Sequence, residues 1–268
     1  MSTLRVEACE LHYSVRGSGA PVVLVQGVGV CGSAWAPQVD RLCSEYSCLA
    51  FDNRGMGASQ PAGRDCSIRQ MALDTLSLMD AQGWESAHLV GHSMGGLIGL
   101  EAALTAPMRV RSLSLLCTFA RGRDATRLTW PLLSIGIRSR IGSRVARRRA
   151  FLELMAPPGS SGGNSDALAE RIGSLFGHDL ADQHPSVMKH LAAMRVHDVT
   201  ARLGELGQIP TTVVSAQHDL IAPPSSGRAI AAGIPGARYV EIPNAAHGVP
   251  ILDAPRINEL LLEHLSAL

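Results

Sequence analysis

The sequence predicts an α/β fold in which a mostly parallel sheet is covered by helices on both faces. Short β-branched or aliphatic segments alternate with longer segments of helical length and spacing, which is the pattern of such a sheet. Residues 21–25 form a continuous apolar run, as expected for a strand that is buried on both faces. Apolar residues make up 46% of the 268 residues and charged residues 18%, so the chain can bury a full core.

Eight segments have the composition of strands. The first two, 4–8 and 11–16, end at a Gly-Ser-Gly turn and predict an antiparallel hairpin at the sheet edge. The other predicted strands are 21–25, 47–52, 87–91, 110–117, 211–216 and 238–242. The predicted helices are 33–43, 67–83, 94–106, a segment near 225–232 and the segment from 253 to the C-terminus. Pro107 ends the third of these helices.

A helical insertion is expected after Cys117, where the alternation stops until Thr211. Ile137, Ile141 and Val145 are apolar at helical spacing, and arginines occupy positions between them. The Gly/Ser-rich segment 157–163 divides the insertion and is expected to be a mobile loop.

The arginines are unevenly distributed. Residues 121–149 contain nine of the 23 arginines and a single acid, so this segment carries +8 and the remainder −7. One interpretation is a solvated face of the helices, because runs of like charge are usually exposed. A second is that some arginines steer or hold a substrate that carries a carboxylate. Binding of nucleic acid or of an anionic membrane by the patch is a minor third interpretation.

Composition also excludes several classes of protein. A net charge of +1 argues against a generally basic nucleic-acid binder, and few aromatic residues accompany the arginines to stack on bases. The sequence has no long apolar segment and no signal-peptide pattern, so we expect a cytoplasmic protein without a membrane partner. The six cysteines lack the spacing of a metal site, and no phosphate-binding G-x-x-x-x-G-K is present. We therefore expect reduced thiols, no metal and no cofactor.

Residues 91–95, Gly-His-Ser-Met-Gly, fit the G-x-S-x-G pattern of a nucleophile elbow. They follow a predicted strand and precede a helix that starts with small residues, which is the context that the elbow requires. The backbone turns sharply at Ser93, so the residues two positions away must lack bulk. A serine that only caps the helix is the alternative. The context favours Ser93 as a nucleophile.

A serine nucleophile needs a base, and the base needs an orienting group. His247 follows the last predicted strand, and Asp219 follows the strand 211–216. Both therefore lie at the carboxyl ends of strands, as Ser93 does, and this is the edge where open α/β sheets bind ligands. We predict that His247 is the base and Asp219 the orienting acid. Asp198 is the rival acid, for which we expect a structural hydrogen bond in a turn.

Acyl transfer also requires two backbone donors for the oxyanion, each worth about 3 to 4 kcal/mol. We assign one to the amide of Met94, the residue after the nucleophile. The other is assigned to the amide of Val28, in the glycine-containing segment 26–29 after the strand 21–25. An ordinary turn is the alternative for these glycines.

With these residues the chain resembles the α/β-hydrolase superfamily, in its esterase, lactonase and C–C hydrolase group. Residues 51–59 add to the resemblance, because they are similar to the D-x-R-G-x-G-x-S turn of the family. The family usually has His-Gly where this chain has Gln26-Gly27, which affects side-chain bonding near the oxyanion loop but not its amides. The resemblance implies an α/β-hydrolase fold with eight strands, a core domain at 1–120 and 201–268, and a helical cap at 121–200 over Ser93.

The resemblance also implies a serine hydrolase that cleaves a carboxylic ester or lactone through an acyl-enzyme on Ser93. C–C bond hydrolysis of a vinylogous keto acid with the same triad is one alternative, and a ligand receptor with slow or no turnover is another. Related dehalogenases and epoxide hydrolases use an aspartate at the elbow, so Ser93 disfavours them. The substrate is expected to be a small molecule, anionic if the arginines hold it. Candidate pocket residues, each of which could instead belong to the core, are Trp35, Phe119, Trp130 and Val249.

Overall fold

The computed structural model describes residues 2–62, 66–125, 129–160, 165–182 and 184–267. Within them it forms one sheet with the strand order β1-β2-β4-β3-β5-β6-β7-β8. The strands are β1 (Ser2–Val6), β2 (Cys9–Arg16), β3 (Ala20–Val25), β4 (Tyr46–Phe51), β5 (Ala87–His92), β6 (Val110–Leu116), β7 (Thr211–Ala216) and β8 (Arg238–Ile242). β1 and β2 pair antiparallel at the edge, β2 joins β4 antiparallel, and the remaining pairs are parallel. The predicted fold class is confirmed.

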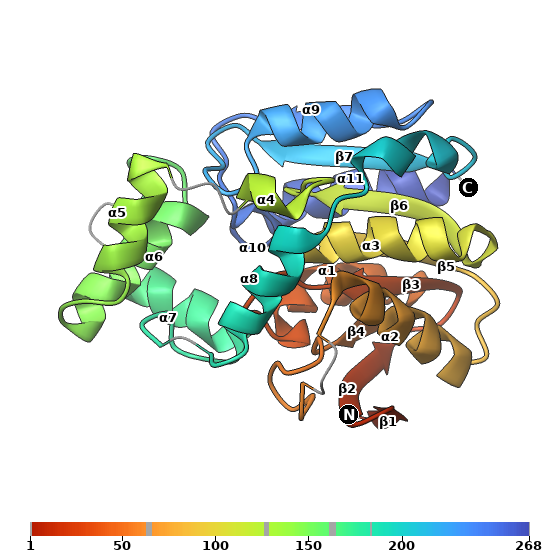
Figure 1. Ribbon diagram of the computed structural model, residues 1–268, viewed down its shortest axis with the longest axis horizontal. Coiled ribbons are helices and arrows are strands. Elements are labelled where there is room, and N and C mark those ends of the chain that lie inside the picture. The colour runs from red at the N-terminus through yellow and green to blue at the C-terminus, as the bar shows by residue number, and fades with distance from the viewer. Residues whose placement is uncertain (1, 63–65, 126–128, 161–164, 183, 268) are drawn as a thin grey trace.

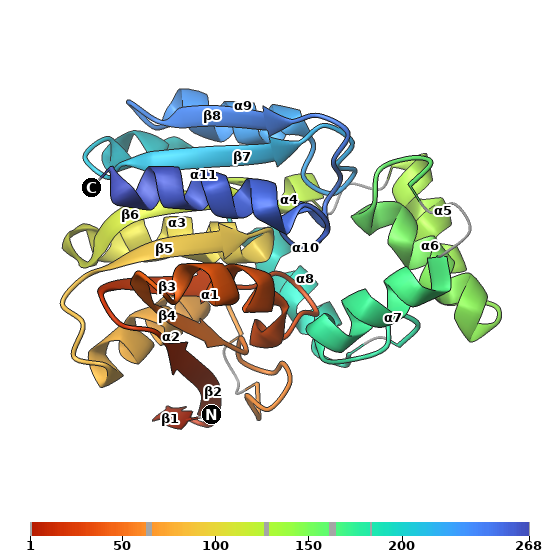
Figure 2. The same cartoon turned by 180° about the vertical axis from the view of Figure 1, so that it is seen from behind.

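Helices cover both faces of the sheet, and each face has its own apolar core. Figure 1 shows one face behind α2 (Ile68–Ala81), α3 (Met94–Thr105) and α9 (Pro224–Gly233). Figure 2 shows the other face, covered by α1 (Ala36–Leu42) and α11 (Ala254–Ser266). Short helical segments connect these elements: η1 (Gly32–Trp35), η2 (Pro107–Arg109), η3 (Thr200–Leu206) and α10 (Val249–Leu252).

The apolar run in β3 serves both cores. Val23 and Val25 point into the core under α2 and α3, whereas Val22 and Leu24 point into the core under α1 and α11. Side chains alternate along a strand, so a strand covered on both faces has to be apolar at every position.

The insertion between β6 and β7 is helical and lies beyond the carboxyl ends of the strands, as both views show. It consists of α4 (Gly122–Ala125), α5 (Trp130–Arg138), α6 (Arg144–Met155), α7 (Ser165–Phe176) and α8 (Val187–Val196). A small apolar core joins α6 and α7 to Val30, Ala34 and Ile251 of the main body. Of the predicted mobile loop, residues 157–160 form a turn, and the rest lies outside the described residues.

The helices in the described ranges include none with the length and apolarity to cross a membrane. Among the same residues, no cluster of His, Cys, Asp and Glu is arranged to hold a metal ion. None of the six cysteines, all of which lie in the described ranges, is part of a disulfide bond.

Candidate active site

Ser93 occupies a strained turn between β5 and α3. Its φ of +56° and ψ of −121° are a conformation that L-residues rarely adopt. Such a tight turn leaves no room beside it: a Cβ at Gly91 would collide with the carbonyl of Gly95, and one at Gly95 with the carbonyl of Val25. The backbone of Ser93 is also held from β6, because its N–H donates to the carbonyl of Leu116 at 3.0 Å.

His247 and Asp219 form a buried pair at the carboxyl ends of β7 and β8. Nδ1 of His247 lies 2.7 Å from Oδ2 of Asp219, and both side chains are at most 5% exposed. The other carboxylate oxygen, Oδ1, accepts the N–H groups of Ile221 and Ala222, each at 2.8 Å. The carboxylate is therefore oriented by the backbone. Because it accepts a hydrogen bond from the Nδ1–H group, it leaves Nε2 of a neutral His247 as the basic nitrogen.

The segment that carries His247 lies against the elbow. His92, which directly precedes Ser93, has its ring centroid 4.7 Å from that of His247. Its Nε2 lies 3.0 Å from the backbone carbonyl oxygen of His247. Tertiary folding thus brings the predicted base to the residue beside the predicted nucleophile.

The predicted oxyanion loop also lies against Ser93. A Cβ built on Gly27 would be 3.0 Å from Cβ of Ser93 and 3.5 Å from its Oγ. Met94 is the first residue of α3, so its N–H has no acceptor within the helix and the positive end of the helix dipole is close to Ser93. The amides of Val28 and Met94 therefore belong to segments that border the hydroxyl from two sides.

Gln26 shows how the loop adapts to the absence of the usual family histidine. Its side chain is buried, and Oε1 accepts the N–H of Gly27 at 3.3 Å. Its backbone carbonyl accepts the side-chain N–H of Asn53 at 2.8 Å. The loop is held at Gln26 by its own side chain and by the turn after β4.

Helices of the insertion bind the two loops that flank Ser93. The N–H of Cys31 donates to the carbonyl of Phe176 at 3.2 Å, and His178 Nε2 lies 2.7 Å from the carbonyl oxygen of Gly29. On the opposite side, the N–H of Gly248 donates to the carbonyl of Met155 at 2.9 Å. The insertion therefore helps to position both the loop with Val28 and the loop with His247.

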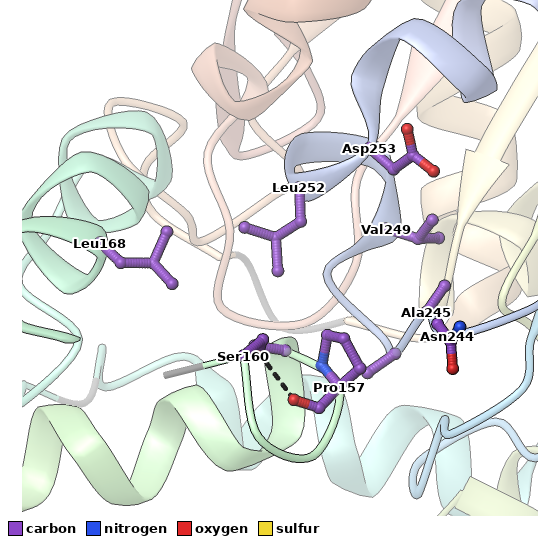
Figure 3. Close-up of a pocket in the computed structure, with 10 residues that line it drawn as sticks. Pro157, Ser160, Leu168, Asn244, Ala245, Val249, Leu252 and Asp253 are labelled. Atoms are coloured by element: carbon purple, nitrogen blue, oxygen red, sulfur yellow. Dashed lines mark hydrogen bonds between the residues drawn. The ribbon is translucent and has the colours of Figure 1, made fainter. Parts of the chain in front are cut away.

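Two cavities lie along the boundary between the insertion and the main body. One, of about 340 Å³, is shown in Figure 3, where Pro157 and Leu168 face Val249 and Leu252 of α10. The second, of about 320 Å³, shares Pro157 with the first and is lined by the insertion except at Leu220, the neighbour of Asp219. Their walls are mostly apolar and lie beside the loops that carry the acid and the histidine.

The four candidate pocket residues lie in different environments. Val249 lines the first cavity. Trp35 and Phe119 are at most 1% exposed and belong to the cores on opposite faces of the sheet. Trp130 is 82% exposed, because α5 buries Ile135 instead and turns its tryptophan to solvent. The helical spacing of apolar residues in α5 therefore does not identify the side that is buried.

The arginines of the insertion have carboxylate partners within it. Four of these arginines pair with acids of a neighbouring helix or of the segment after α7, and most of these pairs are exposed. The pairs are Arg138–Glu153, Arg144–Asp179, Arg144–Asp182, Arg148–Asp179, Arg148–Glu170 and Arg149–Asp166. Hydrogen bonds from Arg148 hold the pKa of the Asp179 carboxyl below its usual range. These ion pairs neutralise part of the cluster locally.

Asp198 has the structural role that we expected. Its Oδ1 accepts the N–H of Thr200 at 2.9 Å, at the start of η3. Asp219, and not Asp198, contacts His247.

Comparison with known proteins agrees with this architecture. A family model described as the alpha/beta hydrolase fold matches residues 20–254. The chain belongs to the α/β-hydrolase family. A relative from Azorhizobium caulinodans named carbamate hydrolase RutD is 32% identical over 259 residues, with 94% of each chain covered. This α/β hydrolase therefore matches the relative over nearly the full length of both chains. The activity in the relative's name is a hydrolysis.

Two solved α/β-hydrolase structures extend the comparison. The enol-lactonase of Burkholderia xenovorans LB400 is 29% identical with a TM-score of 0.81, and the match covers 99% of this chain and 100% of that one. A thermophilic esterase from Thermogutta terrifontis is 25% identical with a TM-score of 0.80, covering 100% and 99%. This chain is thus a hydrolase by family.

Sequence reasoning missed two residues that contact the site. His92 stands inside the G-x-S-x-G motif, so its place beside the nucleophile was a visible signal, although its partner was not. Thr118 donates its hydroxyl to the carbonyl of Ser93 at 2.6 Å, and nothing in its sequence neighbourhood indicates this bond.

Proposed function

We propose that this α/β hydrolase cleaves a carboxylic ester or a lactone through an acyl-enzyme on Ser93. The observation that carries the proposal is the buried Asp219–His247 pair, which lies beside a strained serine at a strand-to-helix turn. In a Ser-His-Asp hydrolase the histidine acts as a base toward the serine, and the acid orients the histidine.

The residues would act in two stages. His247 takes the proton of Ser93 through Nε2 as Oγ attacks the carbonyl carbon, and the imidazolium that forms is stabilised by Asp219. The amides of Val28 and Met94 donate to the oxyanion of the tetrahedral intermediate. His247 then protonates the leaving group. In the second stage His247 activates a water molecule that releases the acid from Ser93.

The relatives support a carbonyl substrate. The enol-lactonase and the esterase match this chain over nearly its full length, and both names denote cleavage of an acyl–oxygen bond. The mostly apolar cavities beside the loops of Asp219 and His247 fit a small, uncharged alkyl group.

Carbamate hydrolysis is the second candidate, favoured by the relative that is 32% identical over 94% of the chain. A carbamate is also attacked at a carbonyl carbon, so the same residues could act on it. The difference lies in the intermediate. Attack by Ser93 on an ester or lactone breaks the acyl–oxygen bond and leaves an acyl group on Oγ, whereas attack on a carbamate ester with loss of its alcohol leaves a carbamoyl group there.

One experiment separates these possibilities. Purified wild type and Ser93→Ala are assayed with p-nitrophenyl acetate, p-nitrophenyl butyrate, a five-membered lactone, an unsubstituted aryl carbamate and a vinylogous keto acid. Mass spectrometry of the intact protein during turnover then identifies any group on Ser93. Turnover of the esters or the lactone by the wild type alone supports the proposal. Equal rates for the two proteins, or a ligand-induced rise in melting temperature without turnover, contradict it.

A further inference from the structure

We propose that His92 is a positioning residue that fixes the backbone of His247 relative to Ser93. The inference rests on the proposed function, since it assigns the way in which the proposed base is held. The side chain of His92 would thus act on the proposed base through a hydrogen bond to the backbone carbonyl of His247.

The contact is direct and buried. Nε2 of His92 lies 3.0 Å from the carbonyl oxygen of His247, the two residues being 155 positions apart in sequence. His92 is 8% exposed and is the last residue of β5, so its backbone is fixed by the centre of the sheet. Its ring and that of Trp35 form a T-shaped contact, with the ring centroids 6.5 Å apart at 85°. A rigid element therefore presents this donor.

The partner determines which nitrogen carries the proton. A carbonyl oxygen only accepts, so Nε2 of His92 must be the donor. Burial, together with the nearby His247, lowers the pKa of His92 to about 3. His92 is therefore neutral at any working pH and carries its single proton on Nε2. A neutral ring also places no positive charge beside the imidazolium that forms on His247.

The loop that carries His247 needs such a restraint. Asp219 holds the imidazole at Nδ1, but a single hydrogen bond allows the ring to pivot about that point. The backbone near His247 is held by His218, whose N–H donates to the carbonyl of Ala245 at 2.8 Å, and by the Gly248–Met155 bond. The Gly248–Met155 bond holds the N–H of the His247–Gly248 peptide from the insertion. The bond from His92 holds the carbonyl oxygen of the same peptide, and it ties that peptide to the strand that carries Ser93.

Two substitutions separate this role from simple packing. His92→Gln keeps an N–H donor at the position of Nε2 but loses the ring, whereas His92→Phe keeps a ring and loses the donor. A positioning role predicts that kcat falls roughly tenfold or more in His92→Phe with KM within about twofold, and that His92→Gln recovers most of the loss. A packing role predicts instead that His92→Phe retains more of the wild-type kcat than His92→Gln does. Equal kcat for His92→Phe and wild type would overturn the inference.

His88 supplies the matched control. It lies on the same strand, is also buried, and bonds through Nδ1 to the hydroxyl of Ser112 at 2.8 Å rather than to a loop of the site. We expect His88→Gln and His88→Phe to lower the melting temperature but to leave kcat of the folded fraction within about twofold of wild type. A loss of kcat in the His88 pair equal to that in the His92 pair would mean that the His92 effect is general destabilisation.

A measurement on the wild type covers the case in which the variants do not fold. Proton–nitrogen correlation spectra of ¹⁵N-histidine-labelled protein report the tautomer of each imidazole. We expect the imidazole of His92 to be neutral, with a slowly exchanging proton on Nε2, between about pH 5 and 8. The buried His190, whose Nε2 lies 2.9 Å from the carbonyl oxygen of Arg54, should give a second signal of this kind. A proton on Nδ1 of His92, or a charged ring, overturns the inference. If wild type and Ser93→Ala are equally inactive, the proposed function fails, and the spectra still decide whether the hydrogen bond exists.

Discussion

Oδ2 of Asp219 lies 2.7 Å from Nδ1 of His247, while Oδ1 of the same carboxylate accepts two backbone N–H groups. The acid is therefore oriented before it meets the imidazole. Its geometry requires the proton of His247 to be on Nδ1, which leaves Nε2 free to act as a base. The pair joins the turns after β7 and β8, which are neighbouring parallel strands.

The tautomer argument leads to the first prediction. Asp219→Asn keeps the size of the side chain but can present an N–H to Nδ1, which favours the wrong tautomer of His247. We expect kcat to fall by roughly 10³–10⁴-fold, as for a triad aspartate elsewhere. Asp198→Asn is the matched control and should retain near wild-type kcat, because the Asp198 carboxylate accepts the N–H of Thr200 at the start of η3 and lies away from His247. An Asp219→Asn variant with a tenth or more of wild-type kcat would contradict the assignment.

The short distance between Gly27 and the side chain of Ser93 leads to the second prediction. In Gly27→Ala the new Cβ lies 3.0 Å from Cβ of Ser93, so the oxyanion loop must shift by a few tenths of an ångström. We expect kcat for an ester to decrease roughly 10- to 100-fold, since the amide of Val28 moves with the loop. Gly204→Ala is the control, because a Cβ there meets nothing within 4 Å. Unchanged kcat in Gly27→Ala would show that the loop does not supply a donor.

The paired arginines lead to the third. Because Arg138, Arg144 and Arg148 have carboxylate partners in the insertion, their field on a distant substrate is small. We expect kcat/KM for a neutral ester and for an anionic ester of the same leaving group to change by the same factor between about 20 and 500 mM salt. A steep fall for the anionic ester alone would restore the steering interpretation.

Buried neutral histidines lead to the fourth. Burial lowers the pKa of His88 to about 4 and that of His92 to about 3, whereas an unfolded histidine titrates near 6.5. Below pH 6.5 the unfolded chain therefore binds protons that the folded protein excludes. The contribution of these two histidines to the free energy of unfolding is fully present above pH 6.5. It decreases as the pH falls toward 4, by about 2 kcal/mol per histidine at pH 5.

Urea denaturation at about pH 7.5 and 5 tests this linkage. The free energy of unfolding of His88→Gln should decrease by about 2 kcal/mol less than that of the wild type over this interval, because the variant lacks one of the two groups. An equal decrease in both proteins would show that His88 is not held neutral by the fold.

Much of the fold was predictable from local patterns. The apolar runs at 21–25 and 87–91 indicate strands covered on both faces, and the glycines at 91 and 95 indicate a turn too tight for a Cβ. Each of these signals depends on the few residues around it. The insertion was also predictable, as the segment where the alternation of strands and helices stops, but its contacts were not. Trp130 is a large apolar residue of the kind that lines pockets, yet its side chain points to solvent.

The sequence by itself determined the α/β class, the elbow at Ser93, and a carboxylate and a histidine after successive strands. It could do so because strands and tight turns produce patterns among neighbouring residues of the sequence. Tertiary structure alone decided that Asp219 rather than Asp198 meets His247, that acids after position 150 pair with several arginines of the cluster, and that His92 reaches a carbonyl 155 residues away. The reason is physical: these contacts join residues that no local spacing relates, and only the packing of parallel strands and the inserted helices brings them within hydrogen-bond distance.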